Sequence, residues 1–195
     1  PLNWRLAASE MLYVLRDSDS TILVHGGDFE ESVRTLRVEL GASVTVLDIA
    51  SLEREASEGS TGSAGFLTDV GDDDIAVQMY TAAFGGRPRG AQITHGGCLA
   101  EAAGVSLVLS ITDADCTLLT VPLFHTFGLE LAIATMFRGG RCVLVDSFEA
   151  RGVASAIERE GVSILVCAGQ QLADVTKESE QNPTDMRSLR IVMGS

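Results

Sequence analysis

The segment that decides the fold is residues 74–95, DIAVQMYTAAFGGRPRGAQITH. Its apolar start, IAVQMY, has the length and composition of a β-strand, and AQIT near its end predicts a second, shorter strand. A loop rich in glycine, proline and arginine joins the two, and small residues from about 95 to 111 predict a long helix. Because ligands bind beyond the carboxyl ends of strands in open α/β sheets, we expect chemistry in this loop.

Strand-like runs alternate with helical patterns on both sides of this segment. Upstream, the strands TILVH and SVTVLDI alternate with the helices ASEMLYVLRDS and FEESVRTLRVEL, and Gly41 suits a left-handed cap. Downstream, the strands CTLLTVPLF, RCVLVD, SILVCA and RIVMG alternate with the helices TFGLELAIATMF, GVASAIERE and QLADVTKES. The alternation predicts a layered α/β fold with largely parallel sheets and helices on their faces. Residues 50–74 are rich in glycine, serine and aspartate, so we expect a loop there, with a subdomain junction near residues 55–74.

Composition narrows the function classes. The chain has 195 residues, of which 46% are hydrophobic, enough to bury the core of one domain or of a large domain with a small annex. Its 27 acidic and 14 basic residues give a net charge of −13, which argues against nucleic acid as a partner. Four cysteines without a C-x-x-C pair argue against a zinc site or a disulfide framework. No membrane span or secretion signal is apparent, so we expect a soluble, cytoplasmic protein.

The loop between the two short strands, residues 80–90, is suited to phosphate. Glycine lets backbone amides approach phosphate oxygens closely, and Arg89 can meet their charge. Composition alone favours a tight structural turn equally well. The loop is not a Walker loop, because G-x-x-x-x-G-K-[ST] is absent from the sequence.

Residues 74–95 resemble the adenylation signature of the ANL superfamily, the acyl-CoA synthetases, adenylation domains and luciferases, in which a strand leads into Y-T-S-G-T-T-G-x-P-K-G and then T-H. The resemblance continues upstream through PLNWRLAASEMLYVLRDS and downstream through VPLFHTFGLELAIATMFRGGRCVLVDSFEA. It extends through IEREGVSILVCAGQQLADV to MRSLRIVMGS, in the order of the family. Residues 1–195 therefore look like a fragment of the large, N-terminal AMP-binding domain of an acyl-CoA synthetase-like ligase.

The resemblance implies a two-step reaction like that of fatty acid activation. A carboxylate attacks the α-phosphate of ATP to form an acyl adenylate, and a thiol, usually that of coenzyme A, then takes the acyl group. ATP, Mg²⁺ and coenzyme A are the implied cofactors, and a small carboxylic acid is the implied substrate. The adenine-binding and ribose-binding segments and the catalytic lysine of the family would follow Ser195, and Lys177 does not match that lysine. We therefore expect no catalytic residue and no turnover in this chain alone, and self-association through apolar faces.

The resemblance assigns five residues to the ATP-phosphate loop, namely Thr81, Gly85, Gly86, Arg89 and Gly90. The loop also departs from the family pattern. Ala82, Ala83 and Phe84 stand where a Ser-Gly-Thr run is usual, Gly85 replaces a further threonine, and Arg89 replaces the usual lysine. Lost hydroxyl donors predict weak ATP binding or greater reliance on backbone amides and Arg89. The alternative is a degenerate, non-catalytic binding or scaffold module. A third reading, an unrelated nucleotide-binding α/β domain, needs a G-x-G-x-x-G turn that HGGDFEES does not supply.

Two residues are assigned by the resemblance to the acyl-substrate pocket, His125 and Gly128. An imidazole at this position can orient the reacting carboxylate. The alternative for His125 is a ring packed under the following apolar helix. His95 is interpreted as a helix-entry residue, His25 has no partner residues that suggest a site, and no metal site is predicted.

Overall fold

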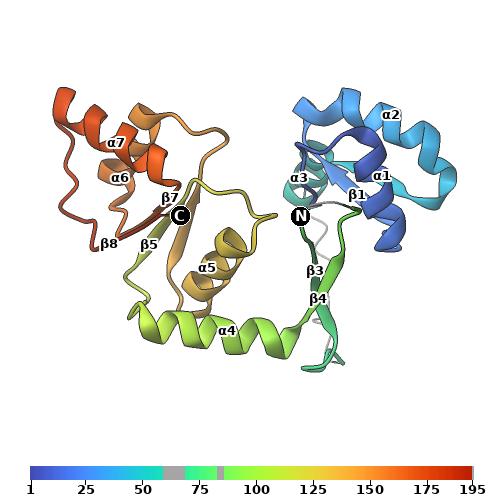
Figure 1. Cartoon of the computed structure of the whole chain (residues 1–195), viewed down its shortest axis with the longest axis horizontal. Helices are drawn as coiled ribbons and strands as arrows, with labels where there is room; N and C mark the ends of the chain where they lie inside the picture. Colours follow the sequence, from blue (N-terminus) through green and yellow to red (C-terminus); the bar gives the residue numbers. More distant parts are fainter. Residues whose placement is uncertain (59–68, 83–85, 195) are drawn as a thin grey trace. The chain divides into compact units, whose positions relative to one another are not determined.

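The computed structural model describes residues 1–58, 69–82 and 86–194 (Figure 1). The chain divides into two compact units. The first comprises residues 1–70 and 78–92, and the second comprises residues 71–77 and 93–195. Part of the junction expected near residues 55–74, namely 59–68, lies outside the described residues.

The first unit is built on two parallel strands, β1 (Ile22–His25) and β2 (Thr45–Asp48), which pair in the register His25 to Asp48. Helices α1 (Ala8–Asp17) and α2 (Glu30–Leu40) supply its core. The core residues are Met11, Leu12, Leu15, Leu23, Val33, Leu36, Leu40 and Val44. Short 3₁₀ turns lie at Gly27–Phe29 and Gly41–Ser43. Gly41 has the expected positive φ of 58°, but its ψ of −139° is not that of a left-handed helical cap.

Helix α3 (Ile49–Ser57) corrects the loop expected from residue 50 onward. Asp48 caps it, because its carboxylate accepts hydrogen bonds from the backbone N and the hydroxyl of Ser51, each at 3.1 Å. None of the residues of α3 is buried. The loop was extended too far toward the N-terminus, because the glycines and aspartates of residues 50–74 all lie after Ser57, where α3 ends. The sequence feature that indicates the start of this helix is its N-cap, an aspartate three residues before a serine.

Strands β3 (Ile75–Tyr80) and β4 (Gly90–Thr94) are the two strands that the sequence predicts, and they pair with each other. Helix α4 (His95–Val108) follows directly. Thr94 caps it, since its hydroxyl oxygen accepts a hydrogen bond from the backbone N of Gly97 at 3.1 Å. His95 is the first residue of the helix, which confirms its interpretation as a helix-entry residue.

The second unit contains a four-stranded parallel sheet in the order β6-β5-β7-β8. Its strands are β5 (Cys116–Leu119), β6 (Arg141–Leu144), β7 (Ile164–Cys167) and β8 (Ile191–Gly194). The helices that alternate with them are α5 (Thr126–Phe137), α6 (Ala150–Glu160) and α7 (Gly169–Gln181). Strand β5 ends at Leu119 instead of running to residue 124, because the chain turns at Pro122, whose carbonyl accepts a hydrogen bond from the backbone N of His125 at 3.0 Å.

Alternate residues of these strands face two separate cores. Leu118 and Leu165 join a cluster with residues of α6 and α7, whereas Leu119 and Val166 join one with residues of α4 and α5. The unit is therefore a layered α/β structure with helices on both faces of a parallel sheet, which confirms the predicted fold class. None of the described helices is long and apolar enough to cross a membrane.

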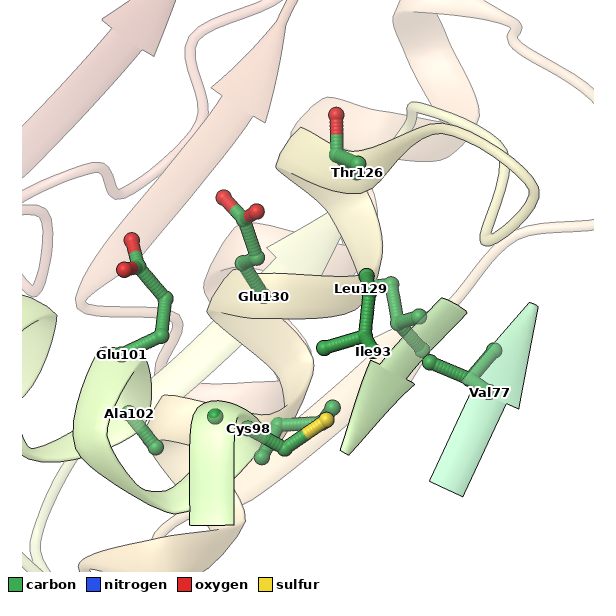
Figure 2. Close-up of a pocket in the computed structure, with 10 residues that line it drawn as sticks. Val77, Ile93, Cys98, Glu101, Ala102, Thr126, Leu129 and Glu130 are labelled. Carbon is green, nitrogen blue, oxygen red and sulfur yellow. The ribbon is translucent and has the colours of Figure 1, made fainter. Parts of the chain in front are cut away.

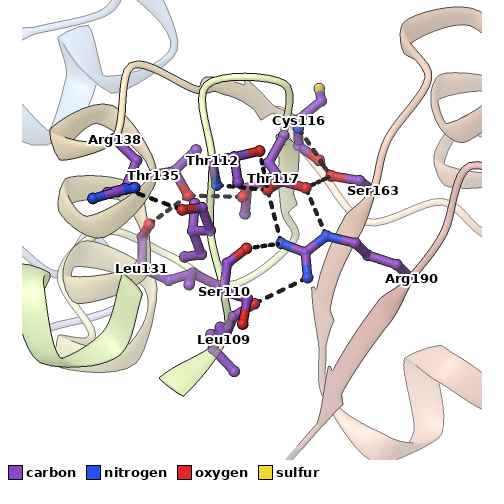
Figure 3. Close-up of polar contacts among 12 residues, drawn as sticks. Leu109, Ser110, Thr112, Cys116, Thr117, Leu131, Thr135, Arg138, Ser163 and Arg190 are labelled. Atoms are coloured by element: carbon purple, nitrogen blue, oxygen red, sulfur yellow. Dashed lines mark hydrogen bonds and ion pairs between the residues drawn. The ribbon is translucent and has the colours of Figure 1, made fainter. Parts of the chain in front are cut away.

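A polar network joins the start of β5 to the residue before β8 (Figure 3). The carboxylate of Asp115 is buried and accepts hydrogen bonds from Nε and Nη2 of Arg190 at 2.8 and 2.7 Å. Arg190 also donates to the backbone carbonyls of Leu109 and Ser110, after the end of α4, at 2.9 and 3.1 Å. The hydroxyl of Ser163 donates to Asp115 at 2.6 Å. Mainly because of the Arg190 hydrogen bonds, the pKa of Asp115 lies well below its usual range.

Candidate functional site

The loop between β3 and β4 is closed at its base by two hydrogen bonds. The backbone N of Thr81 donates to the carbonyl of Arg89 at 3.1 Å, and the backbone N of Arg89 donates to the hydroxyl of Thr81 at 3.1 Å. The Thr81 hydroxyl retains its own proton for donation to a ligand. Two of the predicted loop residues thus fix the ends of the loop, and both are exposed.

Helix α1 anchors the strand that leads into the loop. The hydroxyl of Tyr80 lies 2.7 Å from Oδ2 of Asp17 and accepts a hydrogen bond from Nε2 of Gln78 at 2.7 Å. Burial, and next the hydrogen bond to Asp17, raise the pKa of Tyr80 to about 12. The guanidinium of Arg87 lies over the ring of Tyr13, 5.3 Å from its centroid. Contacts with α1 therefore hold both sides of the loop.

The predicted glycines of this loop have different surroundings. A Cβ on Gly86 would meet no atom within 4 Å, which leaves its backbone open to a ligand. A Cβ on Gly90 would collide with the flexible end of the Gln78 side chain. Gly85 lies outside the described residues, as do Ala83 and Phe84.

His125 lies immediately before helix α5 and is exposed. Its ring centroid is 6.1 Å from that of Phe124, and its carbonyl accepts a hydrogen bond from the backbone N of Leu129 at 3.1 Å. Because His125 is exposed, its ring does not pack under the following helix, which was the alternative interpretation. Its role toward an acyl substrate stays a prediction.

Gly128 is buried in the first turn of α5. A Cβ there would lie 2.9 Å from the carbonyl oxygen of Pro122 and 3.1 Å from Cγ2 of Val121. The close approach of residues 121–122 gives a packing reason for glycine at this position. Its predicted place in an acyl pocket stays a prediction.

A groove that the sequence analysis did not predict lies between α4 and α5 (Figure 2). It has a volume of about 160 Å³ and an apolar floor that includes Val77, Ile93 and Leu129. The carboxylates of Glu101 and Glu130 point to the same side of it (Figure 2). Burial, and next the charge of Glu101, raise the pKa of Glu130. Glu130 is the single acidic residue in the apolar run TFGLELAIATMF, and this was the feature of the sequence that could have indicated the groove.

Metal-binding clusters are not found among the described residues, where no group of three or more His, Cys, Asp or Glu side chains converges. The loop chemistry instead suits the phosphates of a nucleotide, because it combines exposed backbone, a hydroxyl and an arginine. Comparison with known proteins agrees with this reading. The profile of the family described as AMP-binding enzyme matches residues 1–195.

The chain belongs to the AMP-binding enzyme family. A feruloyl-CoA synthase from an Amycolatopsis species is 28% identical to it over 194 residues, which is 99% of this chain and 38% of that protein. Among solved structures, the inhibitor-bound N-terminal domain of FACL13 from Mycobacterium tuberculosis has a TM-score of 0.86 and 26% identity, covering 98% of this chain and 48% of that one.

A further AMP-binding enzyme, the O-succinylbenzoate coenzyme A synthetase MenE from Bacillus subtilis, is similar in a structure with ATP and magnesium ion. Its TM-score is 0.79 at 28% identity, over 98% of this chain and 38% of that one. The chain thus spans less than half the length of these relatives. The resemblance to adenylate-forming enzymes inferred from the sequence is confirmed.

Proposed function

We propose that this chain carries the ATP-phosphate-binding part of an acid–thiol ligase, which forms an acyl adenylate and transfers the acyl group to coenzyme A. The main support is the family match along all 195 residues. Similar proteins are named as CoA synthases and synthetases, and one of them is complexed with ATP and magnesium ion. A small carboxylic acid is the proposed substrate.

In this proposal the loop positions the nucleotide. Backbone amides of Gly86 and Gly90 face the phosphates, and the Thr81 hydroxyl and Arg89 guanidinium donate to charged oxygens. The resemblance also assigns Gly85 to this loop, but Gly85 lies outside the described residues. Mg²⁺ accompanies ATP and neutralises phosphate charge. Adenylyl transfer depends on positioning and charge neutralisation, which suits a loop held at both ends.

We further propose that His125 and Gly128 border the acyl-substrate pocket. The exposed imidazole at the start of α5 is available to hydrogen-bond a carboxylate. Gly128 allows the first turn of this helix to approach residues 121–122 closely, which fixes the position from which His125 projects. We also propose a cytoplasmic location, since the four cysteines are free thiols.

A second candidate is a degenerate module that binds without catalysis. It is favoured by the sequence of the loop, in which Ala82, Ala83 and Phe84 carry no hydroxyl. Such a module would retain the fold without tight binding of ATP phosphates.

Acid-dependent exchange of radioactive pyrophosphate into ATP distinguishes the two candidates. The assay uses the full-length protein that contains this chain and a panel of aliphatic and aromatic carboxylic acids. The ligase proposal predicts exchange that requires one class of acid and is reduced in Arg89→Ala. Exchange that is absent with every acid, in a protein that is folded by circular dichroism, would favour the binding module. The 195-residue chain alone should show no exchange, because Lys177, the one lysine in its sequence, does not match the catalytic lysine of the family.

A further inference from the structure

A buried histidine in the first unit plays no part in the proposed adenylation chemistry. His25 is the last residue of β1 and is 6% exposed. Its Nδ1 lies 3.0 Å from the carbonyl oxygen of Gly26. A carbonyl can only accept a hydrogen bond, so Nδ1 carries a proton. When the ring is neutral, Nε2 is then a hydrogen-bond acceptor.

Nε2 of His25 is buried without a hydrogen-bond partner in the part of the chain that the structure describes. Oε2 of Glu30 lies 3.6 Å away, beyond hydrogen-bonding distance, and an ionised carboxylate is itself an acceptor. With a neutral ring, two acceptors therefore face each other. Buried polar atoms in folded proteins nearly always have a partner, so this nitrogen calls for a donor from outside the described residues.

The ring of His25 lines a cavity of about 200 Å³. The other walls are largely apolar and include Trp4, Met11, Leu23, Phe29, Val33 and Leu36. The rings of Trp4 and Phe29 lie 6.3 Å apart, and both are partly exposed, at 51% and 38%. Two partly exposed aromatic rings, together with aliphatic walls, favour a flat or cyclic apolar body.

Charge narrows the kind of ligand further. A carboxylate or phosphate would be repelled by Glu30 and would offer no donor to Nε2 of His25. A strongly charged group would also lose its hydration against the apolar walls. A neutral hydroxyl meets both conditions, because it donates one hydrogen bond and costs little to bury once bonded.

We propose that this cavity binds a small apolar ring bearing one hydroxyl, a phenol or cyclic alcohol, whose O–H donates to Nε2 of His25. No covalent step is involved. The site lies wholly within the first unit, among residues 2–36. Binding there requires neither ATP nor adenylation, so its failure in an experiment leaves the proposed ligase function untouched.

Trp4 is the single tryptophan of the chain, and it lines the cavity. Its fluorescence, excited at 295 nm, reports binding directly. The probes are phenol and anisole, which share a ring, but only phenol has a donor. We expect phenol to bind about fivefold to tenfold more tightly than anisole, the effect of one neutral hydrogen bond to a buried acceptor. In His25→Phe the two affinities should become equal. His95→Phe, which changes an exposed histidine at the start of α4, should keep the difference.

A measurement on the unmodified chain guards against a variant that does not fold. In ¹⁵N-histidine NMR spectra, phenol should shift the His25 Nε2 resonance in the direction of a hydrogen-bonded acceptor, and anisole should not. Equal binding of the two probes, no binding of either, or an Nε2 that already carries a proton in the free protein would each overturn the proposal.

Discussion

Replacing Arg190 with methionine removes the guanidinium of the polar network but keeps an unbranched stem of similar length. The structure predicts a large cost, because Asp115 is 5% exposed and loses two of its hydrogen bonds. The carbonyls of Leu109 and Ser110 lose their donor as well. Breaking a buried ion pair typically costs about 3–5 kcal/mol.

Two features of the structure reduce the expected cost of breaking this ion pair. The side chain of Arg190 is 37% exposed, so solvent screens part of the interaction. Asp115 also keeps donors from Ser163 and from the backbone N of Thr112, at 2.6 and 2.8 Å. We therefore expect Arg190→Met to lower the free energy of unfolding by about 2–3 kcal/mol, or the melting temperature by roughly 4–12 °C.

The assay is urea unfolding at pH 7, followed by far-ultraviolet circular dichroism. Arg187→Met is the matched control, since Arg187 is 90% exposed and pairs with Asp185 only two residues away. Because solvent screens this exposed pair, Arg187→Met should leave the free energy of unfolding nearly unchanged. The pKa of Asp115 is lowered in the folded state, so its stabilisation is present above the ordinary aspartate pKa and is lost as pH falls. The difference between wild type and Arg190→Met should accordingly shrink below about pH 4. Equal costs for the two variants, or a difference independent of pH, would refute this reasoning.

Three further predictions follow from the structure. Gly128→Ala should destabilise the chain by about 1–3 kcal/mol in the same urea assay, whereas Gly152→Ala, whose Cβ would make only an ordinary contact at 3.8 Å, should be neutral or slightly stabilising. Tyr80 should titrate near pH 12 in absorbance at 295 nm, and Tyr80→Phe should remove that titration. The contribution of Tyr80 to stability should be full below the ordinary tyrosine pKa of about 10 and should be lost as the pH rises from there to about 12. Leu107 and Val108 are 75% and 83% exposed on α4, so light scattering should detect concentration-dependent association. Replacement of both residues by glutamate should reduce this association, and a monomer at all concentrations would contradict the prediction.

Most of the fold was predictable because its signals are local. The run IAVQMY coincides with β3, and TFGLELAIATMF coincides with α5, since length and composition separate strand from helix clearly there. Strand β5 was predicted too long because apolar residues continue through Pro122, where the chain turns. Helix α3 was missed because it directly precedes a stretch rich in glycine, serine and aspartate, and the two were interpreted as one loop.

Sites built from distant residues were harder to predict. Glu101 and Glu130 come from different helices, and their shared groove depends on how α4 and α5 pack. His25 suggested no site in the sequence, because Glu30 and Asp48 approach it only through the first turn of α2 and the parallel register of β1 and β2. The loop between β3 and β4 was predictable because its residues are contiguous in the sequence, and Thr81 and Arg89 meet at its base. Its role toward phosphate stays a prediction.

Titration of ATP into the full-length protein tests the role of this loop most directly. Dissociation constants are measured by calorimetry, with Mg²⁺ present, for the wild type, for Arg89→Ala and for the double variant Ala82→Ser with Phe84→Thr. Loss of Arg89 removes a charged donor worth about 1.5–3 kcal/mol, so that variant should bind ATP at least about tenfold more weakly. The double variant regains hydroxyls at positions where the family has them and should bind more tightly, by about 1–3 kcal/mol in total. Three equal dissociation constants would contradict a phosphate-binding role for the loop.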